Sequence, residues 1–244
     1  MRAVILAAAA ALALTACGRP GPDGINDPYE PVNRQVHAFN RGVDARLVRP
    51  LSAGLKGGAG QGGGPHLAGN TLTAIGNFGA NLGLPVKVVN HLLQGRPAPA
   101  VRMTFRFAVN STLGLAGLRD PATGDFALPE EDTDFGATLA AWGVAEGPYL
   151  ELPLIGPSTA RDATGRVVDL AIDPVGRAMN RDQRLIALGA KVVSKAGERA
   201  RFGDSVDSIL HESADSYAQT RLIWLEHRRH ELGQQGDEID PYAE

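Results

Sequence analysis

The sequence predicts an all-α protein made of short, repeatedly broken amphipathic helices that are joined by long loops rich in glycine and proline. Three observations favour this fold class. Apolar residues recur three and four positions apart through most of the chain, which is the period of one helix face. Clear β-strands are missing from the pattern. The 30 glycines and 16 prolines then interrupt the helical segments every few residues.

Residues 1–16 are typical of a signal peptide. Arg2 precedes an apolar run that ends at Leu14, and this run is too short to span a bilayer. Leu14 to Cys17 fits the cleavage box of a bacterial lipoprotein, so we expect Cys17 to carry a diacylglycerol and an acyl chain. An ordinary signal peptide with an incidental cysteine is the alternative. Gly18 in place of aspartate favours release to the outer membrane, and residues 17–26 are expected to form a lipidated flexible tether.

Composition excludes several classes of function. Without Arg2 the mature chain has 23 basic and 27 acidic residues, so no basic excess exists to bind the phosphates of a nucleic acid. Cys17 is the only cysteine, which excludes an intramolecular disulfide. About 228 mature residues allow one large domain, and we place it at residues 27–232. Residues 233–244 are acidic and are expected to be disordered.

The first helix is predicted to begin at Asp27 as an N-cap and to end near Arg49-Pro50. Its apolar stripe is explained by packing against a core; the alternative is that Asn33, Phe39 and Asn40 border a passage. A glycine run over 54–64 lacks the Gly-Lys-Ser/Thr of a phosphate-binding loop and is interpreted as a connector.

Two helices, Leu67–Phe78 and Val86–Leu93, are predicted next, with a break at Gly79–Pro85 and a C-cap at Gly95. His91 lies within this apolar region and is expected to be a buried, hydrogen-bonded side chain rather than a metal ligand. Another helix is expected to open at Pro97 or Pro99 and to run to about Leu113.

Arg106 and Asn110 are polar residues one turn apart in an apolar helix, so they need partners or an aqueous cavity. An ion pair with an acidic residue and a place on the polar wall of a passage are both open. The acidic loop over 119–134 does not have the spacing of a twelve-residue calcium loop.

The segment from Phe135 to Gly165 begins as a helix and then becomes an apolar loop, which must be buried in protein or set at a lipid boundary. A helix is expected to restart at Ser158-Thr159. The residues expected to shape a mouth are Gly143, Gly147, Pro148, Tyr149, Pro153 and Gly156.

Two further helices are predicted, over Arg184–Phe202 and from Asp215 to about Leu232. His227 and His230, three residues apart, are interpreted as part of a solvated face rather than as metal ligands. We predict no metal site and no cofactor other than the lipid on Cys17.

The motif FGxTL…WGV…GPYLxLPxxGPSTxRDxxG resembles the signature of the MlaA/VacJ family of outer-membrane lipoproteins, and DPYEPVNRxxxxFNxxxDxxxxRP, NFGANLGLPVKVVNHLLQG and RFAVNSTLGLAGLRDPA also resemble family segments. The resemblance covers about Asp27 to Leu232. It implies a ring-like helical domain that lies in the membrane plane, held in the periplasmic leaflet of a Gram-negative outer membrane. The glycine run at 57–64 and Glu146 depart from the family pattern.

The resemblance also implies a function. Family members let phospholipids that are misplaced in the outer leaflet leave through an amphipathic passage, and they pass them to a soluble periplasmic carrier. Trimeric porins are the usual membrane partners. The alternative is an envelope lipoprotein that scaffolds porins without conducting lipid.

Catalysis is not expected. The sequence Gly156-Pro157-Ser158-Thr159-Ala160 is close to the nucleophile elbow of hydrolases, which needs a strand before the serine and a histidine and an acid after it. Pro153 interrupts the supposed strand, and Ser158 is equally well explained as a helix cap.

Overall fold

The computed structural model describes residues 25–57 and 66–234. Cys17, the signal peptide, most of the tether, residues 58–64 of the glycine run and the tail after Gln234 lie outside the described residues. Residues 54–57, the start of that run, were predicted to be a connector but form the end of a helix. The elements are α2 (Glu30–Val43), η2 (Asp44–Val48), α3 (Arg49–Gly57), α4 (His66–Leu93), α5 (Pro97–Thr112), α6 (Pro121–Gly124), α7 (Phe135–Ala141), β1 (Tyr149–Leu152), β2 (Gly156–Thr159), α8 (Ala160–Ile172), α9 (Pro174–Ala178), α10 (Arg181–Arg201), α11 (Gly203–Asp207), η3 (Ser208–Glu212) and α12 (Ser216–Glu231).

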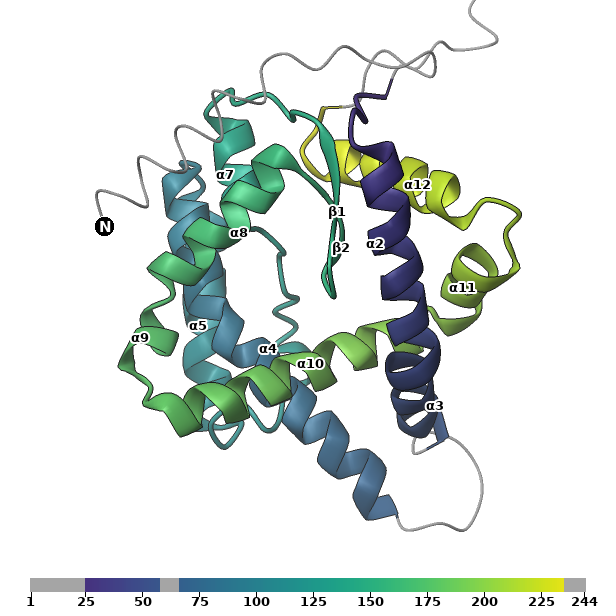
Figure 1. The fold of residues 1–244 in the computed structure, drawn as a ribbon. Helices are drawn as coiled ribbons and strands as arrows, with labels where there is room; N and C mark the ends of the chain where they lie inside the picture. The colour runs from purple at the N-terminus through teal and green to yellow at the C-terminus, as the bar shows by residue number, and fades with distance from the viewer. Residues whose placement is uncertain (1–24, 58–65, 235–244) are drawn as a thin grey trace, which may run out of the picture.

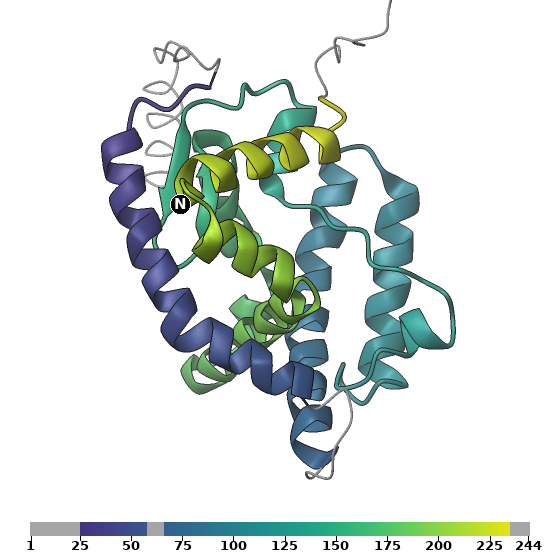
Figure 2. The same cartoon turned by 90° about the vertical axis from the view of Figure 1, so that its right-hand side faces the viewer.

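The elements are arranged in a ring, as predicted (Figure 1). Helix α2 contacts β1, the hairpin leads to α8, α8 packs on α7, and α7 contacts α4. Helix α10 then joins α4 to α3, and the π-helical turn η2 leads back to α2. The view in Figure 2 shows α12 crossing beside this ring, with η3 as its neighbour. The closure uses contacts between segments that are far apart in the sequence.

Helix α4 corrects the prediction of two helices. It is continuous from His66 to Leu93 and carries Pro85 in its interior. The expected break fails because Gly79 serves packing: a Cβ there would lie 2.4 Å from the carbonyl oxygen of Ala190 on α10. The missing side chain lets the two backbones approach closely, which is one of the established uses of glycine.

The hairpin is a second correction, because residues 149–159 were expected to lack strands. Strands β1 and β2 pair antiparallel, with Tyr149 opposite Thr159 and Leu152 opposite Gly156. Pro153 does not prevent the pairing, since it lies in the turn between the strands. The sheet has only these two strands within the described residues.

Most helix boundaries agree with the predictions. Helix α5 opens at Pro97, Thr159 caps α8 by accepting from the amide of Asp162, and Asp215 caps α12. Gly95 has a φ of 71°, as a C-terminal cap requires. Both ends of the first helix are exceptions. Helix α2 begins three residues after Asp27, whose side chain has other partners. The predicted end at Arg49-Pro50 is wrong, because α3 begins there and continues the helical backbone to Gly57, with Pro50 in its first turn where a proline is tolerated.

The apolar surface is unusual for a ring of this size. The buried cluster is small and is built on Tyr149, Tyr217 and Leu225. Many large apolar side chains are instead exposed, on α10 above all and also on α2, α4, α5, α8 and α12. None of the described helices combines the length and the apolar character needed to cross a membrane. Large exposed apolar surfaces mark interfaces with proteins or membranes.

Candidate functional site

The site begins with the turns that lead into and out of the hairpin. Gly143, Gly147 and Gly156 have φ values of 82°, 73° and 94°, a region that L-residues with side chains rarely adopt. Leu154, at the hairpin turn, also has a positive φ of 64° and is 72% exposed. These glycines were predicted to shape a mouth. Their positive φ angles explain why glycine occurs at these three positions.

Asn33 of α2 holds strand β1 with its side-chain amide. Its Nδ2 donates to the carbonyl oxygen of Tyr149 at 3.2 Å, and its Oδ1 accepts from the amide of Glu151 at 2.9 Å. The pattern copies a β-ladder, with one asparagine side chain acting as the neighbouring strand. Asn33 is 3% exposed, so these hydrogen bonds are shielded from water.

Asn40, two helical turns further on, repeats this arrangement at the hairpin turn. Its Nδ2 donates to the carbonyl oxygen of Leu152 at 2.9 Å, and its Oδ1 accepts from the amide of Leu154 at 2.7 Å. Phe39, its neighbour, points away and is 52% exposed. The hairpin is therefore fixed to α2 through the two asparagines.

A buried polar group lies between these two asparagines. His37 places Nε2 3.1 Å from Ser216 Oγ of α12 and Nδ1 3.5 Å from Glu151 Oε1 of β1. Tyr149 donates its hydroxyl to the second oxygen of Glu151. Burial, and then the adjacent Glu151, raises the pKa of Tyr149, so this phenol stays protonated as a donor.

Asp27 connects the start of α2 to α12. Its carboxylate accepts from Asn33 at 2.8 Å, from Arg221 at 2.7 Å and from the hydroxyl of Tyr217. Sequence reasoning had assigned Asp27 to a helix cap and had singled out neither His37 nor Arg221. Only the tertiary contacts bring these residues together.

A cavity of about 190 Å³ lies between α2 and the hairpin. Its lining combines polar residues, such as His37, Asn40 and Glu151, with apolar residues, such as Leu154 and Ile155. Such a lining suits a molecule with a polar and an apolar end.

Arg106 and Asn110 form a separate, buried cluster. Arg106 Nη2 lies 2.7 Å from Asp120 Oδ2, and Asn110 Nδ2 lies 2.9 Å from Asp120 Oδ1. Burial opposes ionisation of Asp120, but hydrogen bonds from Thr123, Asn110 and Arg106 outweigh it and lower the pKa of its carboxyl. The sequence left two possibilities open for Arg106 and Asn110, and the ion pair with an acidic residue is the one that the structure contains.

All four polar side chains predicted for a passage thus have protein partners. Asn33 and Asn40 hold the hairpin, and Arg106 and Asn110 hold the loop that carries Asp120. A role for these residues and Phe39 in lining a passage stays a prediction.

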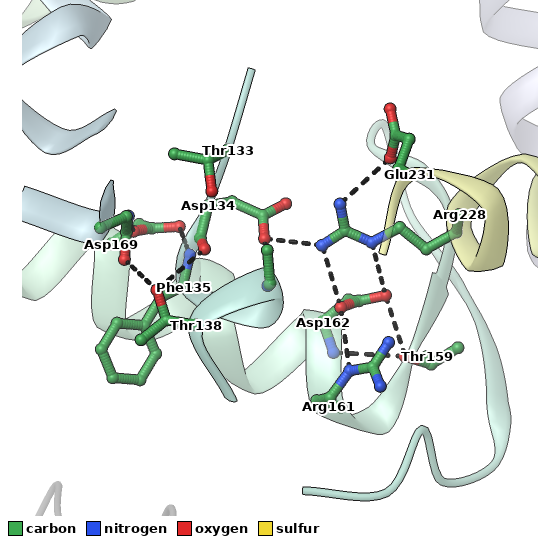
Figure 3. A network of polar contacts seen from close by, with 12 residues as sticks. Thr133, Asp134, Phe135, Thr138, Thr159, Arg161, Asp162, Asp169, Arg228 and Glu231 are labelled. Carbon is green, nitrogen blue, oxygen red and sulfur yellow. Dashed lines mark hydrogen bonds and ion pairs between the residues drawn. The ribbon is translucent and has the colours of Figure 1, made fainter. Parts of the chain in front are cut away.

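A second polar network joins α7, α8 and α12 (Figure 3). Arg228 of α12 lies between two carboxylates, 2.6 Å from Asp134 and 3.1 Å from Asp162. Although burial disfavours the charged form, these two carboxylates raise the pKa of the guanidinium. Arg161, 1% exposed, contacts Asp162 at 3.4 Å, and its Nη2 has no partner among the described residues.

Two glycines of the signature motif belong to this network. A Cβ on Gly136 would lie 2.3 Å from Asp162 Oδ1, and a Cβ on Gly165 would lie 2.3 Å from the amide nitrogen of Gly136. Helices α7 and α8 can therefore approach only because both positions lack a side chain. A cavity of about 500 Å³ opens beside Arg228 and Asp134.

The metal and nucleophile hypotheses find no support among the described residues. Asp44, Asp207 and His211 place ligand atoms within 4.8 Å of one another, but Arg199 bridges both carboxylates at 2.7 Å. The guanidinium of Arg199 therefore occupies the place between the carboxylates that a metal ion would need. Ser158 is fully buried and donates its hydroxyl to the carbonyl oxygen of Thr159, at 3.3 Å.

Comparison with known proteins decides the family. The sequence profile of the MlaA lipoprotein family matches residues 25–231. The chain belongs to this family. It is 34% identical to the intermembrane phospholipid transport system lipoprotein MlaA of Shigella flexneri and 33% identical to that of Escherichia coli K12, each over 93% of this chain and 87% of the relative.

Two further comparisons agree. An uncharacterized protein of Rickettsia felis is 37% identical over 81% of this chain and 74% of its own length. A chain from a solved structure described as "Structural basis for maintenance of bacterial outer membrane lipid asymmetry" matches with a TM-score of 0.68 and 31% identity, over 84% of this chain and 98% of that chain. The recognised motif and the all-helical fold class are confirmed.

Proposed function

We propose that this MlaA-family chain removes misplaced phospholipids from the outer leaflet of a Gram-negative outer membrane and hands them to a soluble periplasmic carrier. The relatives from Shigella flexneri and Escherichia coli support this function, because both are named as lipoproteins of an intermembrane phospholipid transport system. The protein would be held in the periplasmic leaflet by the lipid on Cys17, beside a porin trimer. The domain would occupy residues 27–232, between the tether and the acidic tail.

The observation that carries the proposal is a ring with many exposed apolar side chains, in which the side-chain amides of Asn33 and Asn40 hold the hairpin. Phe105 is 58% exposed, Leu170 78% and Ile186 67%, so a bilayer is a more favourable surrounding for these faces than water. The polar atoms of the hairpin and α2 bond to each other, as irregular backbone at membrane depth must.

The mechanism requires no covalent chemistry, and we propose that the chain is not an enzyme. A phospholipid has a charged head and apolar tails, so its route needs polar groups beside an apolar groove. The cavity between α2 and the hairpin, at one end of β1, is lined by both polar and apolar side chains. The glycine turns at 143, 147 and 156 would set the position of this mouth.

Extraction of lipid from the purified protein tests the proposal. Full-length lipidated protein, purified in mild detergent, is expected to carry phospholipid well above the amount found on an unrelated outer-membrane lipoprotein prepared alongside it. The scaffold alternative predicts porin in the preparation and no phospholipid above that control.

A further inference from the structure

A third cavity, of about 330 Å³, is lined by residues of α8, α9 and α10 and lies away from the hairpin. Figure 1 shows where these three helices meet. Leu82 of α4 lines it, together with the apolar residues Val175 and Ala187. Neither the sequence patterns nor the proposed passage uses this cavity. Its volume falls within the range of small-ligand sites in proteins.

The rim of this cavity is cationic. Arg177, Arg184 and Lys191 line it, against a single acid, Asp173. Asp173 is already engaged: its Oδ1 accepts from the amides of Val175 and Gly176 at 3.1 and 3.0 Å, and its Oδ2 lies 3.8 Å from Lys191 Nζ. The unbalanced charge therefore resides on the two arginines.

Both arginines have donors available for a ligand. Arg184 is held by one bond, from Nε to the carbonyl oxygen of Gly176 at 2.9 Å, which leaves both terminal nitrogens without a partner in the described chain. Arg177 is exposed, and its guanidinium makes no hydrogen bond or ion pair with the described residues. Arginine forks match the geometry of phosphate oxygens.

The apolar part continues outside the cavity. Leu170 is 78% exposed and Leu188 is 60% exposed, and both line the opening. Leu185 and Ile186 extend the apolar surface along α10. A ligand that fits must combine a negative head with an apolar body.

We propose that this cavity binds one anionic phospholipid, with its phosphate between Arg177 and Arg184 and an acyl chain on the surface formed by Leu170, Val175 and Leu188. Charge complementarity selects a lipid of net negative charge over a zwitterionic one, whose ammonium would face the cationic rim. The inference rests on the proposed function only in placing this surface within reach of a bilayer.

Equilibrium binding to the full-length protein in neutral detergent micelles tests this inference. The probes are fluorescent phosphatidylglycerol and phosphatidylcholine with the same acyl chains. Arg177→Gln and Arg184→Gln are each expected to weaken phosphatidylglycerol binding about five-fold, the effect of one basic residue at an anionic lipid surface. Arg181→Gln is the matched control, because Arg181 is exposed on the same helix but outside the cavity; its affinity should stay unchanged.

A third variant separates a lipid from a soluble anion. Val175→Phe fills the cavity and keeps every charge, so it should weaken the binding of phosphatidylglycerol. If glycerol phosphate competes as well as the lipid does and Val175→Phe has no effect, the site binds a soluble anion and the lipid proposal is wrong. Equal affinity for the two lipids, or an equal loss in Arg181→Gln, also contradicts it.

Variants that do not fold are recognised by their circular dichroism spectra, and Arg184→Met, which also removes the charge, then replaces Arg184→Gln. A negative result in this binding experiment would not contradict the proposed transport. The transport proposal is tested separately, by the phospholipid that the wild-type protein carries and by lipid asymmetry in cells.

Discussion

Arg106 is the residue whose environment departs most from its sequence context, since a guanidinium 5% exposed lies on a helix with apolar side chains around it. It donates to Thr123 and to the carbonyl oxygen of Leu128, both at 2.6 Å, as well as to Asp120. One side chain thereby fixes the whole turn between α5 and the acidic loop. Its loss removes three anchors at once.

We predict that Arg106→Met lowers the free energy of unfolding by about 3 kcal/mol, because it leaves Asp120 without its cation in a partly buried place. Arg102→Met is the control. Arg102 pairs with Glu131 at 2.7 Å on the exposed side of the same helix, where a salt bridge contributes less than about 1 kcal/mol. Denaturant unfolding in detergent measures both, and equal losses would contradict the assignment.

His91 gives a prediction of pH dependence. It is fully buried, with Nδ1 unpaired and Nε2 3.5 Å from the carbonyl oxygen of Glu131. Burial lowers the pKa of this imidazole below its usual value. Above about pH 6.5 both folded and unfolded chains carry it neutral. Below that pH only the unfolded chain gains the proton, so the native state loses stability.

The slope from this residue cannot exceed about 1.4 kcal/mol per pH unit. His91→Leu should remove this part of the pH dependence below about pH 6.5. The measurement is the difference between the two stability curves. Parallel curves would show that His91 does not titrate in this way.

At the scale of elements, the contact between α4 and α10 depends on a small residue. We predict that Gly79→Ala destabilises the protein by about 1–3 kcal/mol, the usual cost of overpacking, since its methyl group would meet the backbone of Ala190. Gly76→Ala is the matched control on the same helix, where the nearest atom is 3.5 Å away. Thermal unfolding should show it to be neutral or slightly stabilising.

The hairpin is the second element whose position rests on few contacts. Asn40→Ala leaves the amide of Leu154 and the carbonyl of Leu152 without their partners. We predict hydrogen exchange at the Leu154 amide that is faster by at least about five-fold, since about 1–3 kcal/mol of hydrogen bonding is lost. Gln35→Ala, at an exposed position of α2, is the control. Unchanged exchange in Asn40→Ala would show that Asn40 does not hold the hairpin turn.

The sequence allowed most helices to be predicted, because their caps and periodicity are local signals. Thr159, Asp215 and Gly95 act as their residue types suggest. The hairpin and the continuous α4 were missed because Gly79 and Pro153 have tertiary roles that look like helix or strand breaks. For the site, Asn33 and Asn40 were singled out through the family motif, but their bonds to β1 depend on partners more than 100 positions away.

At the scale of the whole molecule, the ring is closed by a small number of polar junctions rather than by a large apolar core. Three groups of polar contacts each join segments that are distant in the chain: those of Asn33 with β1, those of Asp27 with α12, and those of Arg228 with Asp134 and Asp162. Many large apolar side chains, such as Phe105, Leu170 and Ile186, are exposed rather than buried in this arrangement. This agrees with the proposed contact with lipid.

The measurement that tests the central claim most directly is the phospholipid content of the outer leaflet in cells with and without this gene, taken as the fraction of phospholipid that an added phospholipase reaches in intact cells. Transport predicts a rise in that fraction on deletion and its return to the original value when the wild-type chain is restored. An unchanged fraction in the deletion strain would contradict the account.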